Sequence, residues 1–104
     1  MAYSSDIRQL YEGLGGFMQY RKWSLGYLSA QAVIQVVLRG SASDVFLVDN
    51  ANLRKFECGE EFRYCGGHYQ KSPVRLSPPS GGSWNAVVVP TGGRVEASVQ
   101  VLAA

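Results

Sequence analysis

The fold of this chain is decided by a stretch in its second half, Phe62-Arg63-Tyr64-Cys65-Gly66-Gly67-His68-Tyr69-Gln70-Lys71-Ser72-Pro73-Val74-Arg75-Leu76. A two-residue glycine loop suits the positive φ angles of a type I′ turn, so the stretch predicts a β-hairpin with Gly66-Gly67 at its tip. Side chains alternate between the two faces of a strand. One face of the hairpin would carry Phe62, Tyr64 and Tyr69. The other face would carry Arg63, Cys65, His68 and Gln70. Residues 74–76 follow Pro73 as a short strand at a sheet edge, where proline is tolerated.

Apolar residues recur at every second position on both sides of this stretch, which predicts further strands. The strand over residues 32–39 has one apolar face, made by Ala32, Ile34, Val36 and Leu38. Residues 45–48 are apolar on both faces, which predicts a central or covered strand. In residues 94–102, valine and alanine alternate with polar residues, and we expect this segment to form a last hairpin with residues 84–89.

The remaining segments complete a prediction of the fold class. Residues 1–16 predict an amphipathic helix, because Ile7, Leu10, Tyr11 and Leu14 share one helical face. Residues 17–31 are expected to be irregular, and residues 53–56 to form one helical turn. The chain is therefore predicted to be all-β, a small antiparallel β-sandwich or partly open barrel of six or more short strands. A helical extension over residues 1–16 precedes a single β domain over residues 17–104.

Composition and charge restrict the class of partner. The net charge of +2 comes from scattered residues, whereas a nucleic-acid interface needs a clustered basic stripe, so no nucleic-acid partner is predicted. No apolar run approaches the roughly 20 residues of a membrane span, so no membrane is expected. The N-terminus lacks the pattern of a secretory signal. We therefore expect a cytoplasmic protein, in which both cysteines stay reduced.

The residues capable of catalysis or metal binding do not form a complete site. Cys58, Cys65 and His68 are three soft ligands, but structural zinc requires four, usually with closely spaced cysteines, so no metal is predicted. In the predicted hairpin Cys65 lies beside His68, but no orienting group or oxyanion hole accompanies them. A Cys58–Cys65 disulfide would require an oxidising setting. The glycine pairs lack the following helix that a phosphate loop needs, so no catalytic residues and no cofactor are predicted.

Ligand binding on the outer face of the central hairpin is the remaining chemical hypothesis. Arginine binds carboxylate or phosphate through two hydrogen bonds. The candidate ligand-binding residues are Arg63, His68, Gln70 and Arg75. The ligand would be an anionic metabolite, a nucleotide or a sugar. The competing interpretation is that these arginines form ordinary surface ion pairs with Glu57, Glu60 or Glu61.

Several short motifs, in the same order and spacing, resemble a family of small uncharacterised bacterial proteins known only as a domain of unknown function. The matching segments are Leu25-Gly26-Tyr27-Leu28, Val45-Phe46-Leu47-Val48-Asp49, Gly66-Gly67-His68-Tyr69, Ser72-Pro73-Val74-Arg75-Leu76, Ser83-Trp84 and Gly93-Arg94-Val95. The resemblance covers about residues 18–102. It implies a compact antiparallel β-sandwich without an established activity. In some relatives the domain precedes a TIR-type signalling domain, which would suit sensing or docking.

This chain departs from the family pattern in having Gln31-Ala32 where relatives have a Gly-Asp pair, and no functional residues are carried over from the family. Two functional hypotheses follow from the sequence. The first is a non-enzymatic protein-interaction or self-assembly module, suggested by the apolar face of the N-terminal helix and the strand that is apolar on both faces. The alternative is a small-ligand sensing domain that uses Arg63, His68 and Arg75. An enzyme is the third interpretation.

Overall fold

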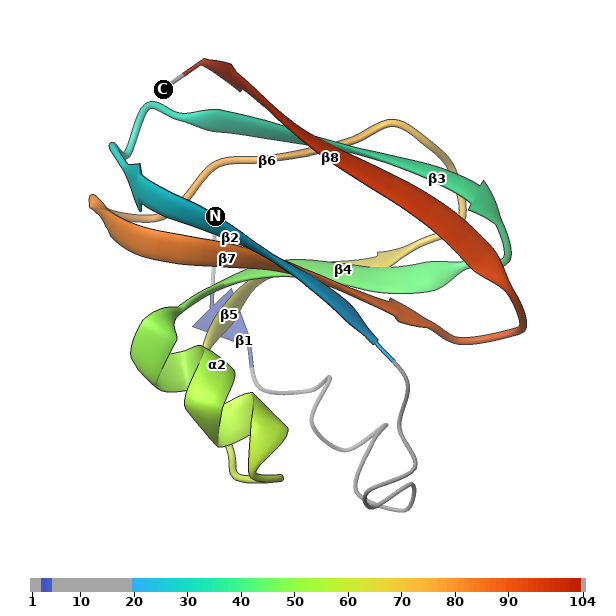
Figure 1. Cartoon of the computed structure of the whole chain (residues 1–104), viewed down its shortest axis with the longest axis horizontal. Helices are drawn as coiled ribbons and strands as arrows, with labels where there is room; N and C mark the ends of the chain where they lie inside the picture. Colours follow the sequence, from blue (N-terminus) through green and yellow to red (C-terminus); the bar gives the residue numbers. More distant parts are fainter. Residues whose placement is uncertain (1–2, 5–19, 104) are drawn as a thin grey trace.

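The computed structural model describes residues 3–4 and 20–103, which form two antiparallel sheets packed face to face (Figure 1). The elements in chain order are β1 (Tyr3–Ser4), β2 (Arg21–Leu28), β3 (Val33–Gly40), β4 (Ser43–Asp49), α2 (Asn50–Glu57), β5 (Tyr64–Tyr69), β6 (Val74–Leu76), β7 (Gly82–Pro90) and β8 (Val95–Ala103). One sheet has five strands in the order β1-β5-β4-β7-β2, and the other has three in the order β6-β3-β8. The predicted β-sandwich is confirmed.

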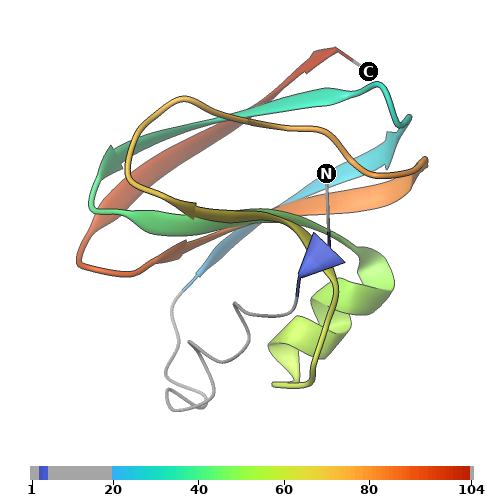
Figure 2. The ribbon, with the colours of Figure 1, turned by 180° about the vertical axis from the view of Figure 1, so that it is seen from behind.

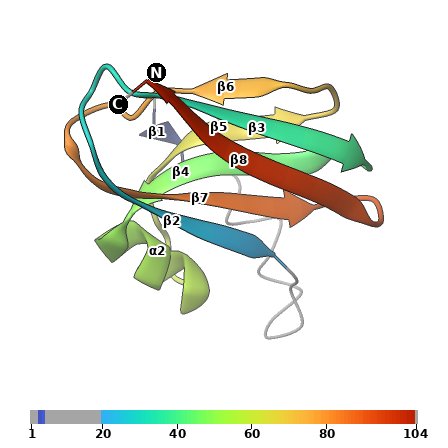
Figure 3. The same cartoon turned by 45° about the horizontal axis from the view of Figure 1, so that its top comes forward.

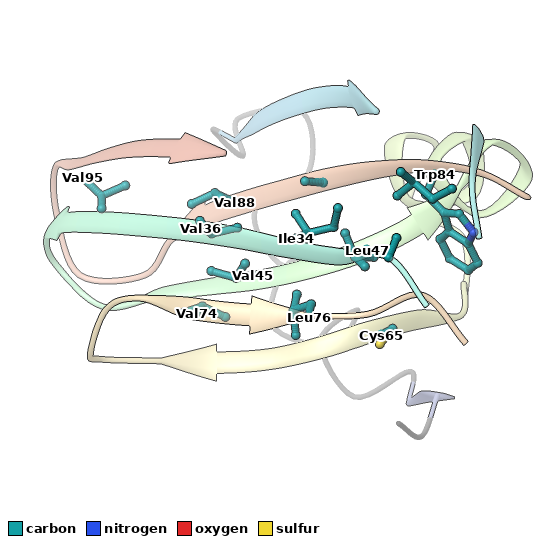
Figure 4. Close-up of a cluster of buried hydrophobic side chains, with 13 residues drawn as sticks. Ile34, Val36, Val45, Leu47, Cys65, Val74, Leu76, Trp84, Val88 and Val95 are labelled. Carbon is teal, nitrogen blue, oxygen red and sulfur yellow. The ribbon is translucent and has the colours of Figure 1, made fainter. Parts of the chain in front are cut away.

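The main core lies between the two sheets, as the close-up in Figure 4 shows. Strand alternation directs every second side chain into this space. From the three-stranded sheet come Ile34 and Val36 of β3, and from the five-stranded sheet come Val45 and Leu47 of β4, all fully buried. The alternation predicted for residues 32–39 is therefore confirmed, and residues 74–76 form the predicted edge strand β6.

A second core covers the opposite face of the five-stranded sheet, where α2 packs (Figure 2). Phe46 of β4 and Phe56 of α2 meet edge to face, with ring centroids 5.4 Å apart. Phe62 and Tyr64 complete this aromatic cluster. Strand β4 is thus central and covered on both faces, as its apolar sequence predicts. The helix is longer than the single predicted turn, because the side chain of Asp49 caps it by accepting from the backbone N–H of Asn52.

The predicted hairpin over residues 62–69 is wrong. Residues Tyr64–Tyr69 form one continuous strand, β5, which pairs along its length with β4, and Gly66 and Gly67 lie in its middle. The physical reason is a close approach of two backbones. A Cβ atom at Gly66 would lie only 2.1 Å from the carbonyl oxygen of Val45. Glycine is needed at position 66 to let two strands pair, and not to turn the chain.

Two further expectations are corrected by the sheet order. Residues 17–31 were expected to be irregular, but Arg21–Leu28 form β2, whose alternation is interrupted by a register shift between Ser24 and Gly26. The last two strands were expected to form a hairpin. Instead β7 pairs with β2 and β4 in one sheet, and β8 pairs with β3 in the other. The helix predicted for residues 1–16 lies outside the described residues, apart from Tyr3–Ser4, which pair with β5.

Candidate functional site

His68 and Asp44 form the most distinctive polar pair among the described residues. They are direct partners on β5 and β4, and His68 Nδ1 lies 2.9 Å from Asp44 Oδ1. Asp44 is fully buried, whereas the side chain of His68 is 46% exposed. The pair shares the α2-facing side of the sheet with Phe46, because alternation places residues 44 and 46 of β4 on the same face. The carboxylate occupies Nδ1, so Nε2 is the ring nitrogen available to a ligand.

Arg75 lies on the other outer face of the sandwich. Its neighbours on β6, Val74 and Leu76, are buried between the sheets, so Arg75 points outward. Arg75 Nε donates to Oε1 of its cross-strand partner Gln35, at 3.0 Å. The structure therefore separates Arg75 from His68 by the thickness of both sheets. The predicted shared surface for these two residues does not form, and the physical reason is that β6 belongs to the other sheet.

Arg63 and Gln70 flank β5 at its two ends. Both are exposed, and the backbone N–H of Arg63 donates to the side-chain oxygen of Asn52 in α2, at 2.8 Å. The six residues of β5, which include the glycine pair, separate Arg63 from Gln70. In the part of the chain that the structure describes, the hydrogen bonds of Arg63, His68 and Arg75 go to Asn52, Asp44 and Gln35, and not to one another. Their ligand-binding role stays a prediction.

Cys65 and His68 lie on opposite faces of β5, which separates the thiol from the imidazole that was expected beside it. Cys65 is buried between the sheets, where its Sγ contacts the carbonyl oxygen of Ser77 at 3.4 Å. Burial raises the pKa of this thiol, which disfavours the nucleophilic thiolate. Cys58, in contrast, is exposed. The described residues contain no cluster of three groups able to hold a metal ion.

A second polar cluster joins α2 to the start of β2, and no sequence pattern predicts it, because Glu57 lies more than 30 residues from both of its partners. The hydroxyl of Tyr20 donates to Glu57 Oε2, and Lys22 Nζ lies 2.7 Å from the same oxygen. Burial, and then the bond to Glu57, raises the pKa of Tyr20 to about 12. The bonds from Lys22 and then Tyr20 lower the pKa of Glu57. Because Tyr20 also stacks edge to face on Phe56, this cluster is best explained as a clamp that holds the helix.

The large exposed apolar side chains of the described residues lie on two edge strands, β2 and β8. Figure 3 and Figure 4 place the edge strands β2 and β8 on the side opposite β5 and β6. Tyr27 of β2 is 73% exposed, and Val101 and Leu102 of β8 are 39% and 46% exposed. Trp23 and Val99 are half-buried against the inter-sheet core. A sequence signal was available, because Val101-Leu102 is an apolar pair where the alternation of β8 would place one polar residue.

The fold defines a class: among the residues that the structure describes, the chain is a small antiparallel β-sandwich with one capped helix. More particularly, the chain belongs to the family described as Domain of unknown function (DUF1883), whose model matches residues 18–104. The family resemblance predicted from the sequence motifs is confirmed. Comparison with curated proteins and with solved structures gives no match. The bacterial origin and the TIR-type neighbour stay predictions.

The described part of the chain offers no helix that has both the length and the apolar character needed to cross a membrane.

Proposed function

We propose that this chain is a non-enzymatic interaction module that binds another protein or a second copy of itself. The observation that carries the proposal is that large exposed apolar side chains lie on the two edge strands of one side of the sandwich, Tyr27 on β2 and Val101 with Leu102 on β8. The neighbouring residues Val101 and Leu102 form an exposed apolar pair, and contiguous exposed apolar groups mark interaction sites more often than isolated ones do. Strand β4, which is apolar on both faces, does not support the proposal, because it is buried within the chain and leaves no face for a partner.

Site-specific photo-crosslinking tests the proposal. A photo-reactive amino acid replaces Leu102 in the full chain, which is expressed in cells that naturally contain the protein. Irradiation should produce adducts with one defined protein or with a second copy of the chain, identified by mass spectrometry. The matched control places the same group at Lys71, which is exposed on the opposite side of the sandwich. A folded protein that gives no protein adduct at position 102 would overturn the proposal.

Anion binding at His68 is a second candidate, because a protonated imidazole that donates from Nδ1 to the buried Asp44 carboxylate also has an Nε2–H that can donate to an anion. An imidazole ring that is already held in one orientation loses less conformational entropy when it binds a ligand. Thermal unfolding with inorganic phosphate, pyrophosphate and a nucleotide tests this idea. Binding at this position should raise the melting temperature of the wild type but not of His68→Ala. Arg75→Ala, on the opposite outer face, should keep the response. An equal response in His68→Ala would reject the site.

A further inference from the structure

The two sheets present four edge strands, and the chain protects them unequally. Unpaired strand edges are templates for pairing with another chain, and proteins usually blunt them with short strands, prolines, bulges or lysines. The edge strands of the described structure are β1 and β2 in one sheet and β6 and β8 in the other.

Three of these edges are blunted. Strand β1 has two residues and pairs with Cys65 and Tyr64, and the rest of β5 contains the Gly66-Gly67 pair, a poor partner for strand addition. Strand β6 has three residues and directly follows Pro73. Strand β2 begins with Arg21-Lys22 and is interrupted by a register shift near Gly26, whose φ is +70°. Each device is one that limits edge-to-edge pairing.

Strand β8 carries none of these devices over its regular part. From Val95 to Val101 it pairs without interruption with β3, and its only register shift comes after Val101. The strand Val95–Ala103 contains no proline, glycine, lysine or arginine, and Glu96 is its one charged residue. Along the inner face, Ala97 and Val99 are half-buried and Val101 is 39% exposed. Within the described residues, the open edge thus borders partly exposed apolar side chains.

A second copy of β8 fits this edge. When two such strands pair antiparallel about a twofold axis at Ser98, the centre of the regular segment, the partners have matching character. The inner pairs are Val95 with Val101 and Ala97 with Val99. The outer pairs are Glu96 with Gln100 and Ser98 with Ser98. No like charges face each other in this pairing. All inner residues stay on the inner face, whereas a register shift of one residue would pair inner residues with outer ones.

We infer that two copies of this chain associate through β8, joining their three-stranded sheets into one sheet of the order β6-β3-β8-β8-β3-β6. This inference rests on the proposed function and names a second copy as the partner. Pairing would satisfy the open backbone groups of β8 and cover Val99 and Val101 with the same residues of the other copy. The interface is isologous, as in most dimers of identical chains.

Sedimentation velocity of the full chain, from micromolar to submillimolar concentration, tests the inference. The wild type should show a monomer–dimer equilibrium. Ser98→Lys should weaken the dimer at least about tenfold, because two like charges would meet at the twofold axis. Ser98→Glu alone should do the same. An equimolar mixture of the two variants should restore the dimer, because opposite charges then meet. Ser98 is exposed, so the circular dichroism and melting temperature of both variants should match the wild type.

Ser24→Lys is the matched control, because Ser24 is an exposed serine on β2, the blunted edge strand of the other sheet. It should leave the dimer intact. A wild type that is monomeric throughout would overturn the inference, as would a dimer that Ser98→Lys does not weaken or that the mixture does not restore. A monomer that still gives crosslinks from position 102 to a different protein rejects the pairing of β8 but supports the proposed function. Failure of the β8 pairing can therefore be distinguished from failure of the proposed interaction function.

Discussion

At position 66 the backbone leaves no room for a side chain. A Cβ atom there would lie 2.1 Å from Val45 O and 2.6 Å from the Cα of Phe46, and the φ angle of +151° is one that L side chains rarely adopt. The neighbouring Gly67 is different, because a Cβ atom at that position meets no atom within 4 Å. The two glycines therefore have unequal importance, although the sequence makes them look alike.

Gly66→Ala should lower the free energy of unfolding by about 2 to 4 kcal/mol, because β4 and β5 must separate or the backbone must change its conformation. Gly67→Ala should change it by less than about 1 kcal/mol. Urea unfolding of both variants measures the difference. Equal destabilisation by the two substitutions would contradict the assignment of Gly66 as the position of close approach.

His68 contributes to stability through its bond to a buried carboxylate. Asp44 is fully buried and His68 Nδ1 lies 2.9 Å from it. His68→Ala should destabilise the fold by about 1 to 2 kcal/mol, because a buried acceptor loses one of its donors. Gln70→Ala, an exposed change two residues further along the chain, should stay within about 0.5 kcal/mol of the wild type. If the two variants unfold at the same urea concentration, the His68–Asp44 bond has no net value for stability.

At the scale of elements, the position of α2 depends on the clamp between Tyr20, Lys22 and Glu57. The pKa of Glu57 is lowered from 4.5, so its contribution to stability is present above pH 4.5 and is lost as the pH falls through its lower folded value. The pKa of Tyr20 is raised from 10.0 to about 12, so the contribution of its protonated hydroxyl is complete below pH 10 and is lost as the pH rises toward 12.

Glu57→Gln should therefore flatten the dependence of stability on pH below 4.5, because the variant has no carboxylate to protonate. The measurement is the midpoint of urea unfolding at a series of acid pH values. Glu60→Gln, in the exposed loop after α2, should keep the wild-type dependence. A Glu57→Gln variant with the same acid dependence as the wild type would show that the clamp does not contribute.

The elements differ in how well the sequence predicts them, and the reason is physical. Strands β3, β4 and β8 were predicted because regular alternation is a local signal of one-sided or two-sided burial. Strand β2 was missed because the shift near Gly26 breaks that alternation. The glycine pair predicts a hairpin, but Gly66 instead allows the close approach of the Val45 backbone, 21 positions earlier in the chain. No local pattern reveals such a long-range contact, so strand β5 could not be predicted from the sequence. The partners of β7 and β8 are likewise set by long-range packing.

The same distinction applies to the candidate sites. The role of His68 as a site residue stays a prediction, and its partner Asp44 could not be found from sequence spacing, because the pair depends on the register of β4 against β5. Arg75 was grouped with His68 on the assumption that its strand pairs alongside the hairpin. It lies in the other sheet instead. Residue types could be predicted from the sequence, whereas their grouping required the order of strands.

At the scale of the whole molecule, Cys65 reports on the separation of the two sheets. Its thiol is 1% exposed within the inter-sheet core, and burial raises its pKa. Cys58 is exposed and should react quickly with a thiol reagent such as DTNB. In a Cys58→Ser variant only Cys65 remains, so its modification measures how often the sheets open.

We expect this modification to be slow in native conditions and to follow global unfolding as urea is added, because every edge of the inter-sheet core must open before the reagent reaches Sγ. The opening free energy obtained from labelling should agree with the unfolding free energy from circular dichroism within about 1 kcal/mol. A labelling rate far above that limit, and insensitive to urea, would mean that β5 separates locally from β4 while the rest of the sandwich stays folded. In that case the side bordered by β5 and β6, and not the β2–β8 side, would be the part of the molecule that opens to a partner.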